Sequence, residues 1–178
     1  MLELFIKGGE FFDSSSSTFI NVSDTTICLE HSLVSLTKWE SKWKKPFLSR
    51  ENKTIEETID YIKCMTLTEN VDPMVYNLLD DAAIKKIQEY IEDPMTATTF
   101  REDKKGSREI ITSEIIYYWM FSLYIPIEFQ EIHLNRLLAQ IKVGSIKNEP
   151  PKKMKKQELM NRNRSLNAAR RAAANSRG

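Results

Sequence analysis

The stretch that decides the fold is TSEIIYYWMFSLYIPIEFQEIHLNRLLAQIKVG, residues 112–144. Its run Ile115–Ile127 is the most apolar part of the chain, but it is too short to span a bilayer and Pro126 interrupts it. One helix begins at Thr112 or Ser113, and Pro126 begins a second. The second helix carries its apolar residues and its glycine end signal at Leu134, Leu137, Leu138, Ile141 and Gly144. We therefore expect two long helices that meet at Pro126 and form the centre of the core.

Capping residues upstream predict further helices. The predicted starts are Ser32, the capping box of Thr54 and Glu57, Asp72 followed by Pro73, and Asp80. Pro46 ends the first of these helices, and Asp93-Pro94 ends the last. The first helix places four apolar residues near one face: Leu33, Leu36, Trp39 and Trp43. The last helix carries Ile84, Ile87 and Ile91. The polar stretch from Thr96 to Arg108 predicts an exposed loop.

The first 30 residues have strand character instead. LELFIK (2–7) and STFINV (17–22) are short runs with aromatic and β-branched residues, and TTICLE (25–30) adds a third. The polar stretch Asp13–Ser17 separates the first two runs, and Gly8-Gly9 predicts a hairpin turn. A hairpin of this size must pack on something else to be stable.

These signals predict a mainly α fold. We expect a helical body of about five to six helices with a small N-terminal β-hairpin and an extended basic C-terminal arm. Residues 1–30 form the hairpin region, residues 31–149 the helical body, and residues 150–178 a basic, partly helical arm.

Charge divides the chain at Pro150-Pro151. Residues 151–178 hold nine Lys or Arg and one acid, whereas the whole chain has a net charge of only +1, so residues 1–150 are acidic. A like-charged arm stays extended until it meets an anionic surface, either nucleic acid or an acidic protein face, including the body of another copy. A thin apolar stripe of Leu159, Leu166 and Ala173 predicts that the arm becomes ordered against its partner.

The sequence contains none of the motifs that identify a catalytic or nucleotide-binding site: no P-loop, no dinucleotide fingerprint, no nucleophile elbow and no H-E-x-x-H. Carboxylate pairs such as Asp80-Asp81 lie at helix starts, where they stabilise the helix dipole. The soft ligands do not have the spacing of a zinc site: Cys28, His31, Cys64 and His133. His133 is interpreted as a core or boundary histidine, and both cysteines as reduced thiols in a cytosol. We expect no enzyme activity, metal or cofactor.

Candidate partner-binding residues occur in two places. Trp39 and Trp43 stand one helical turn apart among lysines. This arrangement suits a binding surface for protein or nucleic acid, but it is more often the edge of a core. The arm supplies the other candidates: Lys152, Lys153, Lys155, Lys156, Leu159, Arg162, Arg164, Leu166, Arg170 and Arg171.

Several segments resemble proteins of tailed bacteriophages. They are LEHSLVSLTKWESKWKKPFL (29–48), YIKCMTLT (61–68), YIEDPMTATTF (90–100), IITSEIIYYWM (110–120), HLNRLL (133–138) and PPKKMKKQELMNRNRSLNAARRAA (150–173). The resemblance is to the virion-structure and tail-assembly gene block, above all to tail assembly chaperones, and it runs from Leu29 almost to the end of the chain.

The resemblance implies a small non-enzymatic protein of the host cytoplasm. Tail assembly chaperones bind the tape measure protein, keep its long hydrophobic helices soluble and recruit tail tube subunits around it. Two alternatives stay open. One is a permanent structural component of the tail or head–tail connector, which would be found in the virion. The other is a nucleic-acid-binding accessory protein that acts through the basic arm. No membrane role is expected.

Overall fold

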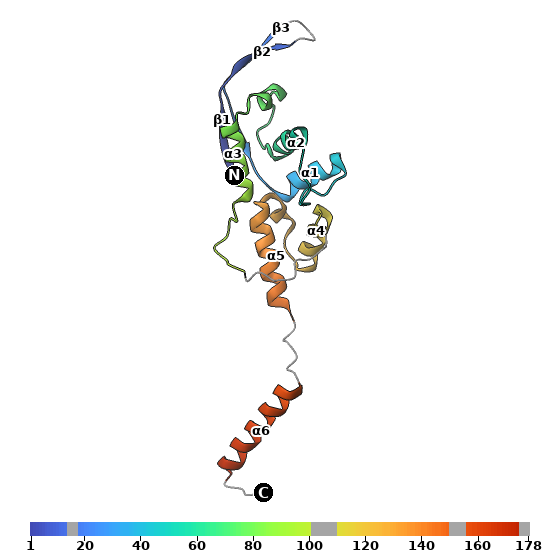
Figure 1. Ribbon diagram of the computed structural model, residues 1–178, viewed down its shortest axis with the longest axis vertical. Helices are drawn as coiled ribbons and strands as arrows, with labels where there is room; N and C mark the ends of the chain where they lie inside the picture. The colour runs from blue at the N-terminus through green and yellow to red at the C-terminus, as the bar shows by residue number, and fades with distance from the viewer. Residues whose placement is uncertain (14–17, 101–109, 150–155, 175–178) are drawn as a thin grey trace. The chain divides into compact units, whose positions relative to one another are not determined.

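The computed structural model describes residues 1–13, 18–100, 110–149 and 156–174. The protein is mainly helical, as predicted, with a small β-structure at its N-terminus (Figure 1). The elements are β1 (Leu2–Ile6), β2 (Gly9–Asp13), β3 (Thr18–Val22), β4 (Thr25–Leu29), α1 (Leu33–Trp43), α2 (Ile55–Met65), the 3-10 helix η1 (Pro73–Leu78), α3 (Asp81–Glu92), α4 (Ser113–Ser122), the 3-10 helix η2 (Ile127–Glu131), α5 (Leu134–Asn148) and α6 (Lys156–Ala173). The chain divides into two compact units, Met1–Ile146 and Lys147–Gly178.

The N-terminal strands form two antiparallel ladders. β1 pairs with β4, with Leu2 opposite Leu29 and Ile6 opposite Thr25, and β2 pairs with β3. Figure 1 shows the chain running out through β1 and β2 and returning through β3 and β4. The predicted hairpin region is therefore built from four short strands.

The prediction that Gly8-Gly9 forms a hairpin turn is wrong. The chain passes through Gly8 from β1 into β2, and the returning chain lies opposite. A Cβ atom on Gly8 would lie 2.2 Å from the carbonyl oxygen of Val22, and the Gly8 N–H donates to Asp24 Oδ1 at 2.7 Å. Glycine is needed here because two backbones approach closely. Most of the polar stretch Asp13–Ser17 lies outside the described residues.

The predicted helix starts are confirmed by their capping contacts. The Ser32 side chain caps α1, and Thr54 and Glu57 form the predicted capping box at the start of α2. Asp80 Oδ1 accepts a hydrogen bond from the Ala83 N–H at 2.7 Å at the start of α3. Asp72, followed by a proline, begins the 3-10 helix η1. These starts are predictable because cap and capped N–H groups lie within one turn of each other.

The core of the first unit consists of two clusters that share α1. One cluster joins β1 and β4 to α2, η1 and α3, and includes Trp39 of α1. The other joins α4 and α5, and includes Leu33 and Leu36 of α1. The apolar residues predicted on one face of this helix therefore divide between two clusters, because α1 contacts α2 and also α4 (Figure 1).

The two helices after residue 110 are shorter than predicted. α4 ends at Ser122, and Pro126 begins η2 rather than a long helix. α5 begins only at Leu134 and continues past Gly144 to Asn148. Gly144 does not end the helix: a Cβ atom there would lie 3.2 Å from a methyl group of Leu123, so glycine allows the end of α4 to pack closely on α5. These helices form one of two core clusters instead of the centre of a single core.

The predicted loop after α3 is described only as far as Phe100, where residues 96–100 have no regular secondary structure. Residues 101–108 of that prediction lie outside the described residues. Among the helices that the structure describes, none has the length and apolar character needed to cross a membrane.

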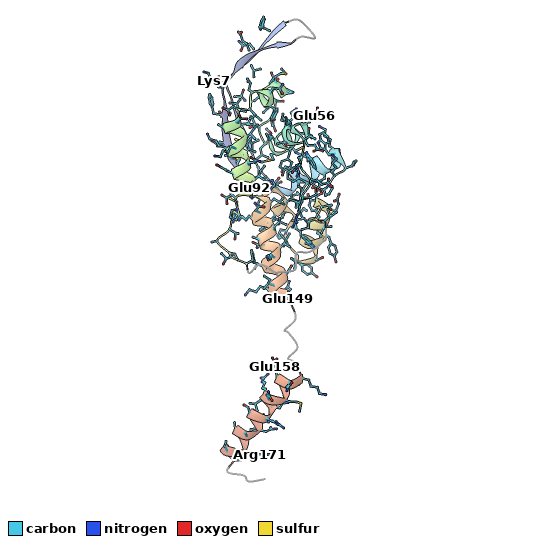
Figure 2. All side chains as sticks on the ribbon, in the orientation of Figure 1. Lys7, Glu56, Glu92, Glu149, Glu158 and Arg171 are labelled. Atoms are coloured by element: carbon cyan, nitrogen blue, oxygen red, sulfur yellow. The ribbon has the colours of Figure 1, made fainter. Side chains whose placement is uncertain are left out.

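The second unit contains α6. No residue of this helix is buried. Its seven-residue spacing places Leu159 and Leu166 on one side, and both side chains are exposed. Figure 2 shows side chains extending around this helix, with Glu158 and Arg171 labelled near its two ends.

Candidate binding cleft

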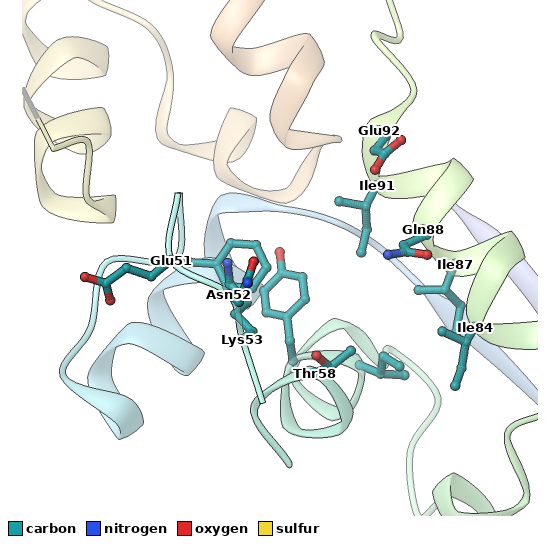
Figure 3. A pocket seen from close by; sticks show the side chains of 12 residues that line it. Glu51, Asn52, Lys53, Thr58, Ile84, Ile87, Gln88, Ile91 and Glu92 are labelled. Atoms are coloured by element: carbon teal, nitrogen blue, oxygen red, sulfur yellow. The ribbon is translucent and has the colours of Figure 1, made fainter. Parts of the chain in front are cut away.

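A cleft in the first unit lies between α2, α3 and the segment 47–53 (Figure 3). Its volume is about 370 Å³, which is near the lower end of the range for ligand-binding pockets. Its apolar lining comes from Phe47, Tyr61, Ile62, Ile84, Ile87 and Ile91. Its polar lining comes from Glu51, Asn52, Lys53, Thr58, Gln88 and Glu92.

One wall of the cleft is the isoleucine face of α3. Ile84, Ile87 and Ile91 follow the spacing that aligns side chains on one side of a helix, and Figure 3 shows them opposite Glu51, Asn52 and Lys53. Ile87 is buried, whereas Ile84 and Ile91 are half-buried. Ile84 belongs to neither core cluster of the described residues, so its side chain mainly lines the cleft.

The floor is made of two stacked rings. The ring centroids of Phe47 and Tyr61 lie 3.8 Å apart, and Tyr61 is buried. A buried carboxylate holds the backbone of Phe47 in place: Glu40 Oε1 accepts from the Phe47 N–H at 2.8 Å, and Oε2 accepts from the Ser113 N–H at 2.8 Å. Glu40 therefore connects the segment 47–53 to the start of α4 through these two hydrogen bonds.

A lysine lies at the edge of this apolar surface. Lys53 Nζ is 4.3 Å from the centroid of the Phe47 ring, a cation–π contact. Burial lowers the pKa of Lys53 below its usual value, and the charge of Glu57 partly offsets this effect. The cleft thus has a partly desolvated cation beside its apolar floor.

The floor is anchored from beneath by the two histidines of the chain. Nδ1 of His31 lies 2.5 Å from the Tyr61 hydroxyl oxygen, and the rings of His31 and His133 are 5.1 Å apart. Burial, together with the charge of His133, lowers the pKa of His31 to about 3. His133 Nε2 donates to the carbonyl oxygen of Tyr90 at 3.0 Å, since its Nδ1 accepts from the Asn135 N–H. His133 is therefore a core histidine, as the sequence predicts.

The chemistry that this arrangement supports is recognition of apolar side chains. Burial raises the pKa of the Tyr61 hydroxyl far above its usual value, so this group does not act as a base. The described residues contain no group of three or more His, Cys, Asp or Glu side chains placed to hold a metal ion. Lys53 and Gln88 are available at the rim for polar contacts.

The two predicted tryptophans lie at the contact between α1 and α2. Trp39 is only 1% exposed, and its indole N–H donates to the carbonyl oxygen of Glu57 at 2.8 Å. Trp43 is half-buried and donates to Asp60 Oδ2 at 2.9 Å, and Lys42 forms an ion pair with the same Asp60. Trp39 therefore offers almost no surface to a partner, whereas Trp43 keeps part of its ring accessible.

The other predicted residues belong to the basic arm. Lys152, Lys153 and Lys155 lie outside the described residues. The remaining candidates are all exposed on α6: Lys156, Leu159, Arg162, Arg164, Leu166, Arg170 and Arg171.

Sequence reasoning did not find the cleft. The isoleucines of α3 are recognisable as a helix face, but no local signal places Phe47 and Lys53 opposite them. Comparison of the chain with protein families, with curated proteins and with solved structures finds no match.

Proposed function

We propose that this protein is a non-enzymatic assembly chaperone that holds an apolar helix of a partner in the cleft between α2 and α3. The observation that carries the proposal is the apolar lining of this cleft, where Ile84 and Ile91 remain half-exposed beside the aromatic floor of Phe47 and Tyr61. A helix that presents apolar side chains one turn apart fits such a groove. The rim residues Lys53 and Gln88 supply polar contacts beside it.

The resemblance to tail assembly chaperones suggests the identity of the partner. In this proposal the bound helix belongs to the tape measure protein, whose hydrophobic helices need cover before the tail tube assembles, and tail tube protein joins the complex later. The host cytoplasm is then the place of action. The basic C-terminal arm, which contains α6, supplies positive charge for further contacts with acidic protein faces.

Co-expression with the tape measure protein of the same gene block tests the proposal. The chaperone should raise the soluble fraction of the tape measure protein and co-purify with it. Ile84→Ser removes apolar surface from the cleft wall and should weaken binding about tenfold, with little effect on the fold. The matched control is Ile55→Ser, because Ile55 is 80% exposed and does not line the cleft. Equal binding by both variants, or an unchanged soluble fraction with the wild-type protein, would contradict the proposal.

Two measurements separate this function from its alternatives. Mass spectrometry of purified virions should not detect a chaperone, whereas a permanent component of the tail or connector would be present. A gel shift with DNA compares the intact chain with a chain that ends at Pro150. DNA binding that requires the arm would favour a nucleic-acid-binding accessory protein, because the described part of the arm carries five basic residues and one acid.

A further inference from the structure

A second surface of the first unit lies on α4 and on the turn after it, and the proposed function does not use it. Tyr118 is 68% exposed, Phe121 is 63% exposed and Tyr124 is 94% exposed. We call these three residues the aromatic patch. α4 is apolar on nearly all sides, a composition that belongs to helices buried all round. One side of α4 packs on α1 and α5. The opposite side is exposed, although this composition predicts that it is buried.

Tyr124 has a backbone conformation that its side chain disfavours. Its φ is 56°, in the left-handed region, where a bulky residue is strained. The Tyr124 N–H donates to the Phe121 carbonyl at 3.2 Å and the Ile125 N–H to the Met120 carbonyl at 2.9 Å, which is the Schellman helix end. Glycine normally occupies this position. A strained, exposed tyrosine in its place indicates a role outside the folding of the chain.

The segment of the chain that carries the patch has only negative charges. Residues 113–131 contain Glu114, Glu128 and Glu131 and no Lys or Arg, and all three acids are exposed. Like charges on this segment disfavour direct pairing between the patches of two copies. The occupant that fits is a helix with an apolar stripe and a positive charge.

The chain itself carries a helix of this chemistry. α6 contains five Lys or Arg and one acid, and its stripe residues Leu159 and Leu166 are 45% and 44% exposed. Its 18 residues are long enough to cross a patch that spans the last turn of α4 and the turn after it. No residue of α6 is buried, so the Leu159 and Leu166 side chains of its stripe are exposed to a partner.

We infer that the aromatic patch binds α6 of a second copy of the chain. Leu159 and Leu166 pack on the rings of the patch, and the arginines of α6 lie near Glu114, Glu128 and Glu131. Two copies associate when α6 of one copy binds the aromatic patch of the other. This contact buries both exposed apolar surfaces. This inference does not rest on the proposed function, since it uses a different surface.

Sedimentation velocity of the full chain at increasing concentration tests the inference. The wild-type protein should self-associate, and added NaCl should weaken the association because the contact is partly ionic. Tyr124→Gly should weaken self-association about tenfold by removing one ring from the patch. The same change should raise the melting temperature by about 2–4 °C, because glycine relieves the strained helix end. Lost association therefore cannot be attributed to unfolding.

Two controls make the result specific. Met95→Gly also relieves a left-handed residue, with φ 49°, and removes an apolar side chain outside the patch, so it should leave self-association unchanged. Ile84→Ser, the cleft variant, should also leave it unchanged. The cleft variant therefore tests the chaperone proposal, and the patch variant tests self-association, so one can fail without the other.

A mixing experiment decides whether the contact is between copies. One variant is Tyr124→Gly, and the other carries Arg170→Glu and Arg171→Glu in α6. Each variant alone should associate more weakly than the wild type, but their mixture should form heterodimers, because one copy supplies an intact arm and the other an intact patch. A monomeric wild-type protein, a mixture that stays monomeric, or variants that associate like the wild type would each overturn the inference.

Discussion

His31 is a single side chain whose ionisation is linked to the stability of the whole first unit. It is 2% exposed and contacts the cleft floor through Tyr61. In the unfolded chain it takes up a proton below its ordinary pKa of 6.5, whereas in the folded protein its pKa is about 3. The unfolded state therefore binds more protons between these two values, and folding stability falls as the pH falls through this window.

We predict that the His31→Gln variant loses less stability in mild acid than the wild type. Between pH 8 and pH 5.5 the wild type should lose about 1.4 kcal/mol more than the variant, since glutamine has no proton to take up but can still bond to Tyr61. Urea unfolding at several pH values measures the difference. Parallel curves for the two proteins would show that His31 already accepts a proton in the folded state.

Local sequence indicates the burial of His133 but not its contact with His31. His133 is predicted as a core or boundary residue because leucines flank it on a helix. Its partner His31 lies in another segment, and the two meet because the Leu134 N–H donates to the His31 carbonyl at 2.7 Å. No spacing in the sequence encodes such a bridge between distant segments.

At the scale of elements, local residues predict where a helix starts better than they predict how long the helix is. Ser32 and Asp80 cap helices wherever the rest of the chain lies, because cap and N–H groups are neighbours in sequence. The start of α5 is different. Its first residues are held by the backbone bridge between Ser32 and His133, so tertiary contacts delay the helix beyond Pro126.

The β-ribbon provides a test at this scale. Gly8→Ala should destabilise the first unit by about 1–3 kcal/mol, because the new methyl group would meet the backbone of the returning strand, which cannot move aside easily. Thermal or urea unfolding measures the change.

Gly9→Ala is the matched control for this substitution. A Cβ atom on Gly9 would meet only the end of the Leu78 side chain at 3.2 Å, which can rotate. The variant should therefore remain close to the wild type in stability. Equal costs at the two positions would show that glycine is needed for its backbone freedom rather than for close approach.

At the scale of the whole molecule, the buried residues that the structure describes all lie in the first unit. Its two clusters share α1, whereas α6 in the second unit has no buried residue. We predict that a chain ending at Glu149 unfolds at the same temperature as the full chain in dilute solution, because hydrophobic burial supplies most of the folding free energy. Circular dichroism melts of both proteins test this. A clearly lower melting temperature for the shorter chain would mean that the arm stabilises the body within one copy.

Composition, capping residues and charge, which are local or additive properties, were enough to indicate a mainly helical body, strands before residue 30 and a basic arm. The cleft, the sharing of α1 between two clusters and the exposed side of α4 depend on which distant segments meet. An apolar run such as Ile115–Ile127 predicts a buried helix, yet its outer side is exposed because α1 and α5 cover only one side of α4. The number of hydrophobic residues indicates how much apolar surface should be buried. Only the tertiary packing decides which part of that surface is buried.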